Sequence, residues 1–453
     1  MGFDDAMRAL LGEAYPAYEE AMRAPAVKGL RFNPLRGDPV KLEALLPWQG
    51  QPVPWCPEGR TLPENIRAGR YALHAAGVYY LQEPSAMAPA VQLKVQPGQR
   101  VLDLCAAPGG KAGQLAAALQ GEGLLIANEP VMSRARVLAE NLQRLGVVNA
   151  IVTAEKPQML ARRFPDYFDR ILVDAPCSGE GMFRRNPDAR QEWQEGSNAG
   201  CALRQSEILE AAYQMLKPGG ALVYSTCTFS KIENEQVCQA FLDAHADLSL
   251  EEVPLFPGWE MGFGGVGARL YPHRLQGEGQ FLAAFIKADK DGEEECEPDK
   301  IKAVLHKPSR AMADFFAAAL PMRPLPERVI CWGRQCFALP QDAPPFDGLK
   351  IVLPGLQLGE DRERYFIPAH ALALVTAPFA SAQGSLLNYA AEDAEILHYL
   401  RGETFAIPKE LEGWHRIAVQ GFPIGWVKTV QGRAQNHLPK GLRLTGEIAW
   451  RYA

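Results

Sequence analysis

Between residues 100 and 290, short apolar runs alternate with longer stretches in which apolar residues recur at helical spacing. Short apolar runs are typical of buried strands, and the periodic stretches are typical of amphipathic helices. The runs predict strands at residues 101–104, 124–129, 151–153, 168–174, 221–226 and 280–287. The periodic stretches predict helices at residues 111–119, 133–145, 203–216 and 233–244. This alternation indicates βαβ units and a doubly wound parallel sheet of the α/β class.

The sequence on either side of this region has a different pattern. Residues 1–90 read as helices and turns. Residues 289–299 contain seven acids and one lysine, a block that repels itself and buries nothing. After it, short strands are predicted at residues 332–339, 349–353 and 364–367, and again from about residue 404. We therefore expect five segments: an N-terminal extension (1–90), a core (91–288), an acidic linker (289–300), an intermediate domain (301–375) and a C-terminal β domain (376–453).

The composition is that of a globular protein. The chain has 453 residues, of which 47% are hydrophobic and 22% are charged. No apolar run approaches the roughly 18–20 residues that span a bilayer, and Asp4 and Asp5 stand where a secretory signal would carry basic residues. We expect a cytoplasmic protein with no membrane partner.

Charge and cysteine content narrow the function classes further. The net charge of −6 argues against a general polyanion binder, although residues 428–451 carry five basic residues and one acid. The nine cysteines include no C-x-x-C pair, and the nearest late pair is Cys331 and Cys336. We therefore expect neither a disulfide framework nor a metal site, and regard any important cysteine as a reactive thiol.

The ends of the predicted strands carry the candidate chemistry, because ligands of doubly wound sheets bind there. The first strand runs into a turn with Gly109 and Gly110, whose backbone can approach a ligand closely. The turn lacks the spacings of dinucleotide and nucleoside-triphosphate sites. Glu129, at the end of the second strand, suits the two hydroxyls of a ribose.

Two cysteines follow the fourth and fifth predicted strands. Cys177 comes three residues after Asp174, and Cys227 lies in a turn of hydroxyl side chains. A lone cysteine is usually a small buried hydrophobe. Two thiols at neighbouring strand ends on one edge of the sheet instead indicate covalent chemistry.

Five motifs together resemble the NOL/NOP/Sun family of RNA 5-methylcytosine methyltransferases, in particular its RsmF-type members. The resemblance covers nearly the whole chain and is strongest over residues 78–287. It implies a Rossmann-like class I methyltransferase core, an RNA-contacting N-terminal extension and a PUA-like C-terminal domain. The motifs are YYLQEPSAM (79–87), DLCAAPGGK (103–111), DAPCSGEGM (174–182), STCT (225–228) and NHLPKG (436–441).

The resemblance implies S-adenosyl-L-methionine as the methyl donor. Its methionine end would be held by the first turn, Glu129 would bind the ribose, and Arg134 and Asp174 would complete the site. Glu155 stands where the family commonly has an Asp near the adenine, but Ala154-Glu155-Lys156 departs from the usual Asn-Asp pattern. The residues of the turn are Cys105, Ala106, Ala107, Pro108, Gly109, Gly110 and Lys111.

The catalytic residues implied are Cys227, Cys177, Asp174 and Lys111. A thiolate adding to C6 of cytosine makes C5 nucleophilic, and Lys111 or the sulfonium charge could favour that thiolate. Local chemistry does not decide which cysteine attacks, because the Pro-Cys at Cys177 also resembles the nucleophile motif of DNA cytosine methyltransferases. The resemblance assigns the attack to Cys227, product release to Cys177 and recognition of the cytosine to Asp174.

The partner implied is RNA, either ribosomal RNA or the small ribosomal subunit, bound by a monomer. We expect the basic C-terminal residues, together with Arg162-Arg163 and Arg184-Arg185, to line the RNA groove. Transfer RNA as the substrate and a non-catalytic assembly factor are the alternatives, and a small-molecule methyltransferase would leave the basic region unexplained. The basic and polar C-terminal residues are Lys428, Arg433, His437, Lys440 and Arg443.

Overall fold

The structure is a computed structural model that describes residues 2–289, 305–375 and 386–444, apart from Glu195, Met322 and Pro324. The acidic linker lies outside the described residues except for Asp289, as do the C-terminal Glu447 and Arg451. Among the described residues, no helix is long and apolar enough to cross a membrane.

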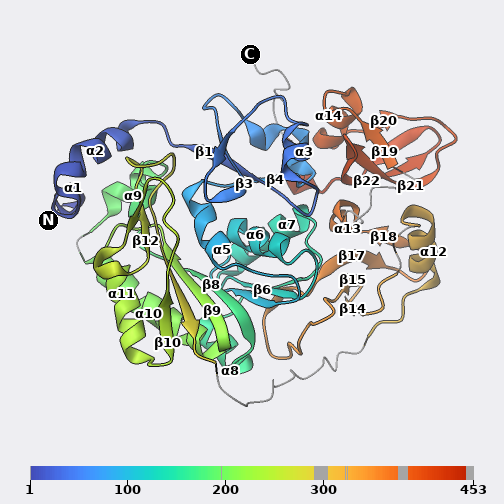
Figure 1. The fold of residues 1–453 in the computed structure, drawn as a ribbon. Helices are drawn as coiled ribbons and strands as arrows, with labels where there is room; N and C mark the ends of the chain where they lie inside the picture. Colours follow the sequence, from blue (N-terminus) through green and yellow to red (C-terminus); the bar gives the residue numbers. More distant parts are fainter. Residues whose placement is uncertain are drawn as a thin grey trace.

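The core is a twisted sheet with helices on both faces (Figure 1). Its strand order is β11-β12-β13-β9-β8-β5-β6-β7-β16, and β10 (Leu248–Glu251) pairs with β13. Strands β5 to β9 are mutually parallel, whereas β13 and β16 join antiparallel. The strands are β5 (Arg100–Asp103), β6 (Leu124–Asn128), β7 (Ala150–Thr153), β8 (Phe168–Asp174), β9 (Leu216–Thr226), β11 (Trp259–Met261), β12 (Ala268–Leu270), β13 (Gln280–Lys287) and β16 (Ile351–Leu353).

The order of the strands places a switch point between β5 and β8. From β5 the chain builds outward through β6 and β7, and it then returns to add β8 and β9 on the other side of β5. Loops leave this point in opposite directions, which opens a crevice past the strand ends. The connecting helices are α6 (Gly110–Ala118), α7 (Met132–Arg144), α8 (Pro157–Arg163), α10 (Ser197–Met215) and α11 (Glu235–Ala244).

The doubly wound sheet predicted from the sequence is therefore confirmed. Strands β8 and β13 have the predicted limits, and β9 begins five residues earlier, at Leu216. Each of these strands contains a short apolar run that is buried except for Ile286, at 171–173, 221–224 and 281–286, and these runs were a strong signal. The helix predicted at 203–216 is longer and begins at Ser197.

The N-terminal extension differs from its helical prediction because it also contains a four-stranded sheet of order β2-β3-β1-β4. Two of these strands have only three residues, too few to establish an alternating pattern. The strands are β1 (Lys28–Phe32), β2 (Gln51–Val53), β3 (Cys56–Leu62) and β4 (Tyr79–Leu81), and the helices are α1 (Phe3–Leu11), α2 (Tyr15–Arg23), α3 (Pro39–Glu43), α4 (Ala72–Ala75) and α5 (Ala88–Gln92).

After the core, the chain forms two further sheets. Strands β14 (Val329–Trp332), β15 (Gln335–Ala338), β17 (Leu356–Asp361) and β18 (Phe366–Pro368) form one, accompanied by α12 (Arg310–Ala319) and α13 (His370–Leu374). The other comprises β19 (Leu386–Tyr389), β20 (Phe405–Ala406), β21 (Gly413–Val419), β22 (Phe422–Val430) and β23 (Arg433–Asn436), accompanied by α14 (Ala394–Arg401).

Two expectations for this region were wrong. The strand predicted at 332–339 is a hairpin turning at Gly333, whose φ of +61° suits glycine. Cys331 and Cys336 face each other across that hairpin and form a disulfide. This disulfide was not predicted, because the cysteine spacing gave no sign of a disulfide framework. In addition, β16 leaves the intermediate segment and pairs with β7 of the core sheet.

Candidate active site

The glycine-rich turn after β5 forms one wall of a cavity of about 190 Å³ at the switch point. Gly109 has a φ of +114°, and a Cβ on Gly110 would lie 3.1 Å from Cε1 of Tyr80. These two positions therefore favour glycine. The other walls come from Tyr80, Leu81, Gln82, Glu83 and Ala86 of the N-terminal extension and from Asp103, Lys111 and Asp174 of the core.

Asp103, the last residue of β5, is the most unusual group in this cavity. It is fully buried, and neither carboxylate oxygen accepts a well-formed hydrogen bond. Burial raises its pKa to about 8, and the Asp174 carboxylate adds to this effect while Lys111 opposes it. A buried carboxylate without a well-formed hydrogen bond is unfavourable on its own, so Asp103 favours a ligand that carries a positive charge or a hydrogen-bond donor.

Asp174 and Lys111 form an ion pair beside Asp103. Lys111 Nζ lies 2.8 Å from Asp174 Oδ2, and the Ser225 hydroxyl donates to Asp174 Oδ1 at 2.6 Å. Burial disfavours the charged form of Lys111, but Asp174, Cys227 and Asp103 outweigh it and raise the pKa of Lys111. Lys111 therefore stays protonated, and the pair fixes the Asp174 carboxylate at the mouth of the cavity.

The two predicted reactive thiols are in contact, because β8 and β9 are neighbouring parallel strands. The Sγ atoms of Cys177 and Cys227 lie 3.4 Å apart. The hydrogen bond with Cys227, burial and the Glu233 carboxylate all raise the pKa of the Cys177 thiol. Cys177 therefore keeps its proton and can donate a hydrogen bond to a thiolate on Cys227.

A buried carboxylate that sequence reasoning missed holds the Cys177 turn. Glu233, just before α11, accepts hydrogen bonds from the backbone N–H of Ser178 at 3.0 Å and from the Ser178 hydroxyl at 2.6 Å. The side-chain amides of Asn198 and Gln205 each donate to it at 2.8 Å. The only sequence signal was an acid next to the start of an apolar helix, a place where acids are common.

Glu180 supports the Cys227 turn in the same way. Its carboxylate accepts from the Phe229 backbone N–H at 3.0 Å, from Trp193 Nε1 at 3.0 Å and from Asn198 Nδ2 at 2.8 Å. Asn198 thus bridges Glu180 and Glu233. The two cysteine-bearing turns share one hydrogen-bonded support.

Glu129 and Arg134 lie together on the β6 side of the turn. Their side chains form an ion pair of 3.2 Å, and Arg134 also donates to the carbonyl of Ala107 at 3.4 Å. Glu129 is buried, whereas Arg134 is more than half exposed. A buried acid at the end of this strand is suited to a ligand with vicinal hydroxyls.

Glu155 and Cys105, the remaining predicted cofactor residues, make different contacts from Glu129 and Arg134. Glu155 is buried, and its Oε1 accepts from the Lys350 backbone N–H at 2.7 Å, next to β16. It therefore helps to hold the intermediate segment on the core. Like Glu129 and Arg134, it is not among the described residues that line the cavity. Cys105 lines the cavity, but burial and the Asp103 carboxylate raise the pKa of its thiol, so it is no competing nucleophile.

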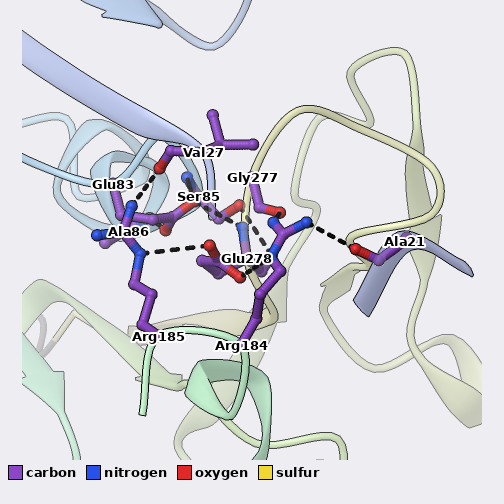
Figure 2. Close-up of polar contacts among 9 residues, drawn as sticks. All are labelled: Ala21, Val27, Glu83, Ser85, Ala86, Arg184, Arg185, Gly277 and Glu278. Atoms are coloured by element: carbon purple, nitrogen blue, oxygen red, sulfur yellow. Dashed lines mark hydrogen bonds and ion pairs between the residues drawn. The ribbon is translucent and has the colours of Figure 1, made fainter. Parts of the chain in front are cut away.

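Three of the four arginines expected to line the RNA groove have partners within the protein, whereas Arg162 is exposed. Arg163 ends α8 at the opposite edge of the sheet and donates to the Pro345 carbonyl at 2.8 Å. Arg184 is buried against Glu278, and Arg185 pairs with the same carboxylate (Figure 2). Charge in a sequence does not reveal burial, so paired arginines resembled an exposed basic patch.

Comparison with known families matches four consecutive parts of the chain. The N-terminal domain of 16S rRNA methyltransferase RsmF matches residues 1–84, and 16S rRNA methyltransferase RsmB/F matches residues 90–286. The RsmF rRNA methyltransferase first C-terminal domain matches residues 314–375, and the methyltransferase RsmF PUA domain matches residues 387–444.

Full-length relatives agree with these matches. The chain is 32% identical to ribosomal RNA small subunit methyltransferase F of Shewanella loihica, over 92% of this chain and 89% of the relative. It is 33% identical to the protein of the same name from Pectobacterium atrosepticum, over 93% and 90%. The chain belongs to the RsmF family of methyltransferases.

Solved structures agree on the fold. A methyltransferase homologue from Pyrococcus horikoshii is 33% identical, with a TM-score of 0.55 over 62% of this chain and 93% of that chain. NSun6 from Pyrococcus horikoshii, solved with SFG, is 24% identical, with a TM-score of 0.54 over 63% and 98%, and supports the fold alone.

RsmF-family proteins use S-adenosylmethionine, and the cavity fits this cofactor. The unpartnered Asp103 carboxylate suits the ammonium group of the methionine end, and the glycines allow close approach of the backbone. Glu129, with Arg134 beside it, would hold the ribose. When bound, the cofactor supplies an electrophilic methyl group.

Proposed function

We propose that this protein methylates C5 of a cytosine in small-subunit ribosomal RNA. The observation that carries the proposal is the 3.4 Å contact between the Cys177 and Cys227 sulfurs, at strand ends that also hold Asp174. The relatives' names, which specify ribosomal RNA of the small subunit, support the class of substrate.

Cys227 is the nucleophile in this proposal. C5 of cytosine is too weak a nucleophile by itself, and a thiolate that bonds to C6 makes C5 nucleophilic. The raised pKa of Cys177 leaves that thiol as a hydrogen-bond donor toward Cys227, which stabilises a Cys227 thiolate. The ammonium of Lys111 favours the thiolate further, because Lys111 and Cys227 interact electrostatically.

Cys177 acts in the second half of the reaction. After methylation, a base must take the C5 proton so that the C6–S bond can break and the C5–C6 double bond can form again. Cys177 keeps its proton, so we assign it to the leaving sulfur: its thiol donates a hydrogen bond to Cys227 as the C6–S electron pair returns to that sulfur, while solvent water takes the C5 proton.

Asp174 selects the base. Lys111 and Ser225 hold its two oxygens in a fixed orientation, and its side chain is about one-third exposed. We assign Asp174 to the N3–N4 edge of the ring, where cytosine and uracil differ. A base attacked at C6 cannot remain stacked in a helix, so the target nucleotide must be unpaired or flipped out.

The flanking segments bind the RNA in this proposal. Residues 1–90 form part of the cavity wall, and residues 376–453 carry the basic side chains that phosphates require. The ring centroids of His437 and Trp414 lie 4.4 Å apart, and Lys428 Nζ lies 5.8 Å from the centroid of the Trp414 ring. This group combines charge with an aromatic surface, as single-stranded RNA sites often do.

Bisulfite sequencing of ribosomal and transfer RNA tests this proposal. Cells that carry the intact gene, no gene, or a Cys227→Ser allele would be compared. We expect one or more protected cytosines in small-subunit ribosomal RNA that lose protection in the second and third strains. Loss of a transfer RNA site instead would change the substrate, and no loss in either RNA would favour an assembly factor.

A further inference from the structure

Two arginines that follow the Cys177 turn converge on one buried carboxylate (Figure 2). Arg184 Nε lies 2.9 Å from Glu278 Oε2, and Arg185 Nε lies 3.3 Å from Glu278 Oε1. The Glu278 side chain is fully buried, and that of Arg184 is 6% exposed. A buried ion pair keeps one geometry, because breaking it would leave a charge uncompensated.

The same arginines hold the N-terminal extension. Arg184 Nη1 donates to the carbonyl of Ala21 in α2 at 3.0 Å, and Arg185 donates to the carbonyl of Val27, just before β1 (Figure 2). Both acceptors are backbone carbonyls, so the contacts fix the path of the extension between α2 and β1. The guanidinium of Arg184 also donates to the carbonyl of Gly277 at 2.8 Å.

A second acid ties this cluster to the wall of the cavity. Glu83 is buried, and its carboxylate accepts from the backbone N–H groups of Ser85 at 2.9 Å, Ala86 at 2.8 Å and Glu278 at 2.7 Å. The Ser85 hydroxyl donates to the Glu278 carbonyl at 3.0 Å. Glu83 and Ala86 line the cavity, so the loop that carries Glu278 is fixed against it.

Backbone hydrogen bonds lead from this loop to the nucleophile. The Gly279 N–H donates to the Gly181 carbonyl at 3.1 Å, and the Gly181 N–H donates to the Cys227 carbonyl at 2.8 Å. The two glycines pack back to back, since a Cβ on Gly181 would lie 2.7 Å from Cα of Gly279 and 2.9 Å from the Cys227 carbonyl oxygen. The Arg184–Glu278 ion pair spans the same two segments.

We propose that Arg184 and Glu278 are positioning residues that hold the Cys227 carbonyl and the Cys177 turn in register while anchoring the N-terminal extension. This inference rests on the proposed function, because it assumes that both cysteines act on the RNA base. The two side chains touch neither the thiols nor the cavity. They act through the Gly279–Gly181–Cys227 backbone contacts, and they link the placement of the extension to the alignment of the thiols.

Arg184→Met in the full-length protein tests the inference. Methylation of saturating RNA would be measured in a single turnover, together with the KM for RNA and the Kd for S-adenosylmethionine. Since small displacements of a catalytic group cost up to about 100-fold in rate, we expect a loss of about 10- to 100-fold in the rate constant. Both binding constants should change by less than about twofold, and Arg184→Lys should recover part of the rate because it keeps the charge opposite Glu278.

Arg190→Met is the matched control. Arg190 also joins the core to the N-terminal extension, through an ion pair of 2.5 Å with Asp4, but it has no contact with the Gly181–Gly279 segment. We expect this variant to keep the wild-type rate. If Arg184→Met does not fold, Glu278→Gln, which removes the charge but keeps the side-chain volume, replaces it.

Three results would overturn the inference: an unchanged rate in Arg184→Met, a change confined to the KM for RNA, or an equal loss in Arg190→Met. Failure of the proposed function would look different. In that case the wild-type protein itself would form no 5-methylcytosine, whatever the Arg184 variants did.

Discussion

At the residue scale, the cavity combines a paired carboxylate with an unpaired one. Asp174 has Lys111 and Ser225 as partners, whereas both oxygens of Asp103 are buried and accept no well-formed hydrogen bond. In the proposed function, this pair orients Asp174 toward the RNA base. The ionised Asp103 carboxylate instead lowers the stability of the protein unless a cationic ligand is bound. Cofactor affinity should therefore depend on pH.

Asp103→Asn should remove the pH dependence of cofactor binding. In the wild-type protein, a rise from pH 6 to 7.5 should tighten cofactor binding several-fold, because the cation favours the ionised carboxylate and Asp103 has a pKa of about 8. The variant should bind at least tenfold more weakly and with little pH dependence. Calorimetric titration at several pH values would measure this, and a pH-dependent affinity that persists in the variant would contradict it.

The ligand-free protein should show the opposite trend in stability. The pKa of Asp103 is raised in the fold above its unfolded value of 3.8, so its protonated form favours folding. This contribution is complete below about pH 4 and is lost as the pH rises through about 8. Thermal unfolding without cofactor should therefore show Asp103→Asn gaining stability over the wild type at pH 8 to 9 and little at pH 5. Equal effects at both pH values would exclude this explanation.

At the element scale, the site depends on turns that other elements hold in place. Glu233 accepts four hydrogen bonds within 3.0 Å, all from the Cys177 turn and from α10. We expect Glu233→Ala to lower the single-turnover methylation rate by about 10- to 100-fold and to lower the melting temperature, because it leaves these donors buried and unpaired. Glu207→Ala, an exposed acid on α10, is the control, and an equal effect of both variants would contradict the role of Glu233.

The sequence was sufficient to predict the strands and helices of the core, but not the long-range contacts that hold the site in place. The strands β8 and β13 contain short apolar runs, and the closeness of the two cysteine turns follows from the order of parallel strands. The contacts of Glu155 with Lys350 and of Arg184 with Glu278 join residues 195 and 94 positions apart. Local sequence patterns do not show which distant residues will be in contact, so neither contact could be predicted.

At the scale of the whole molecule, the first and last segments share a hydrophobic core. Leu30 and Phe32 of β1 belong to the same buried cluster as Tyr399 of α14 and Ile417 of β21, and Figure 1 shows the two sheets side by side. Buried Asn33 joins the extension to the core as well, by donating to the carbonyl of Leu145 at 2.9 Å. The segments predicted as separate units along the chain are therefore packed together in the fold.

Ile417→Ala should reveal this shared core. Ile417 is fully buried, so the variant should lose about 2–4 kcal/mol of stability. The loss should also speed proteolysis within residues 1–90, although the substitution lies more than 300 positions away. Limited proteolysis with mass spectrometry would locate the cleavage sites. Cleavage that increases only within the C-terminal β domain would show that the two segments unfold independently.

The most direct test of the central claim is to trap the covalent bond between the protein and the RNA. Wild-type protein, Cys177→Ala and Cys227→Ala would each be incubated with substrate RNA and S-adenosylmethionine and then separated on denaturing gels. We expect Cys177→Ala to accumulate a protein–RNA adduct that persists, because release fails, and Cys227→Ala to form none. A persistent adduct in Cys227→Ala and none in Cys177→Ala would reverse the two roles, and no adduct in either variant would contradict covalent catalysis by this pair.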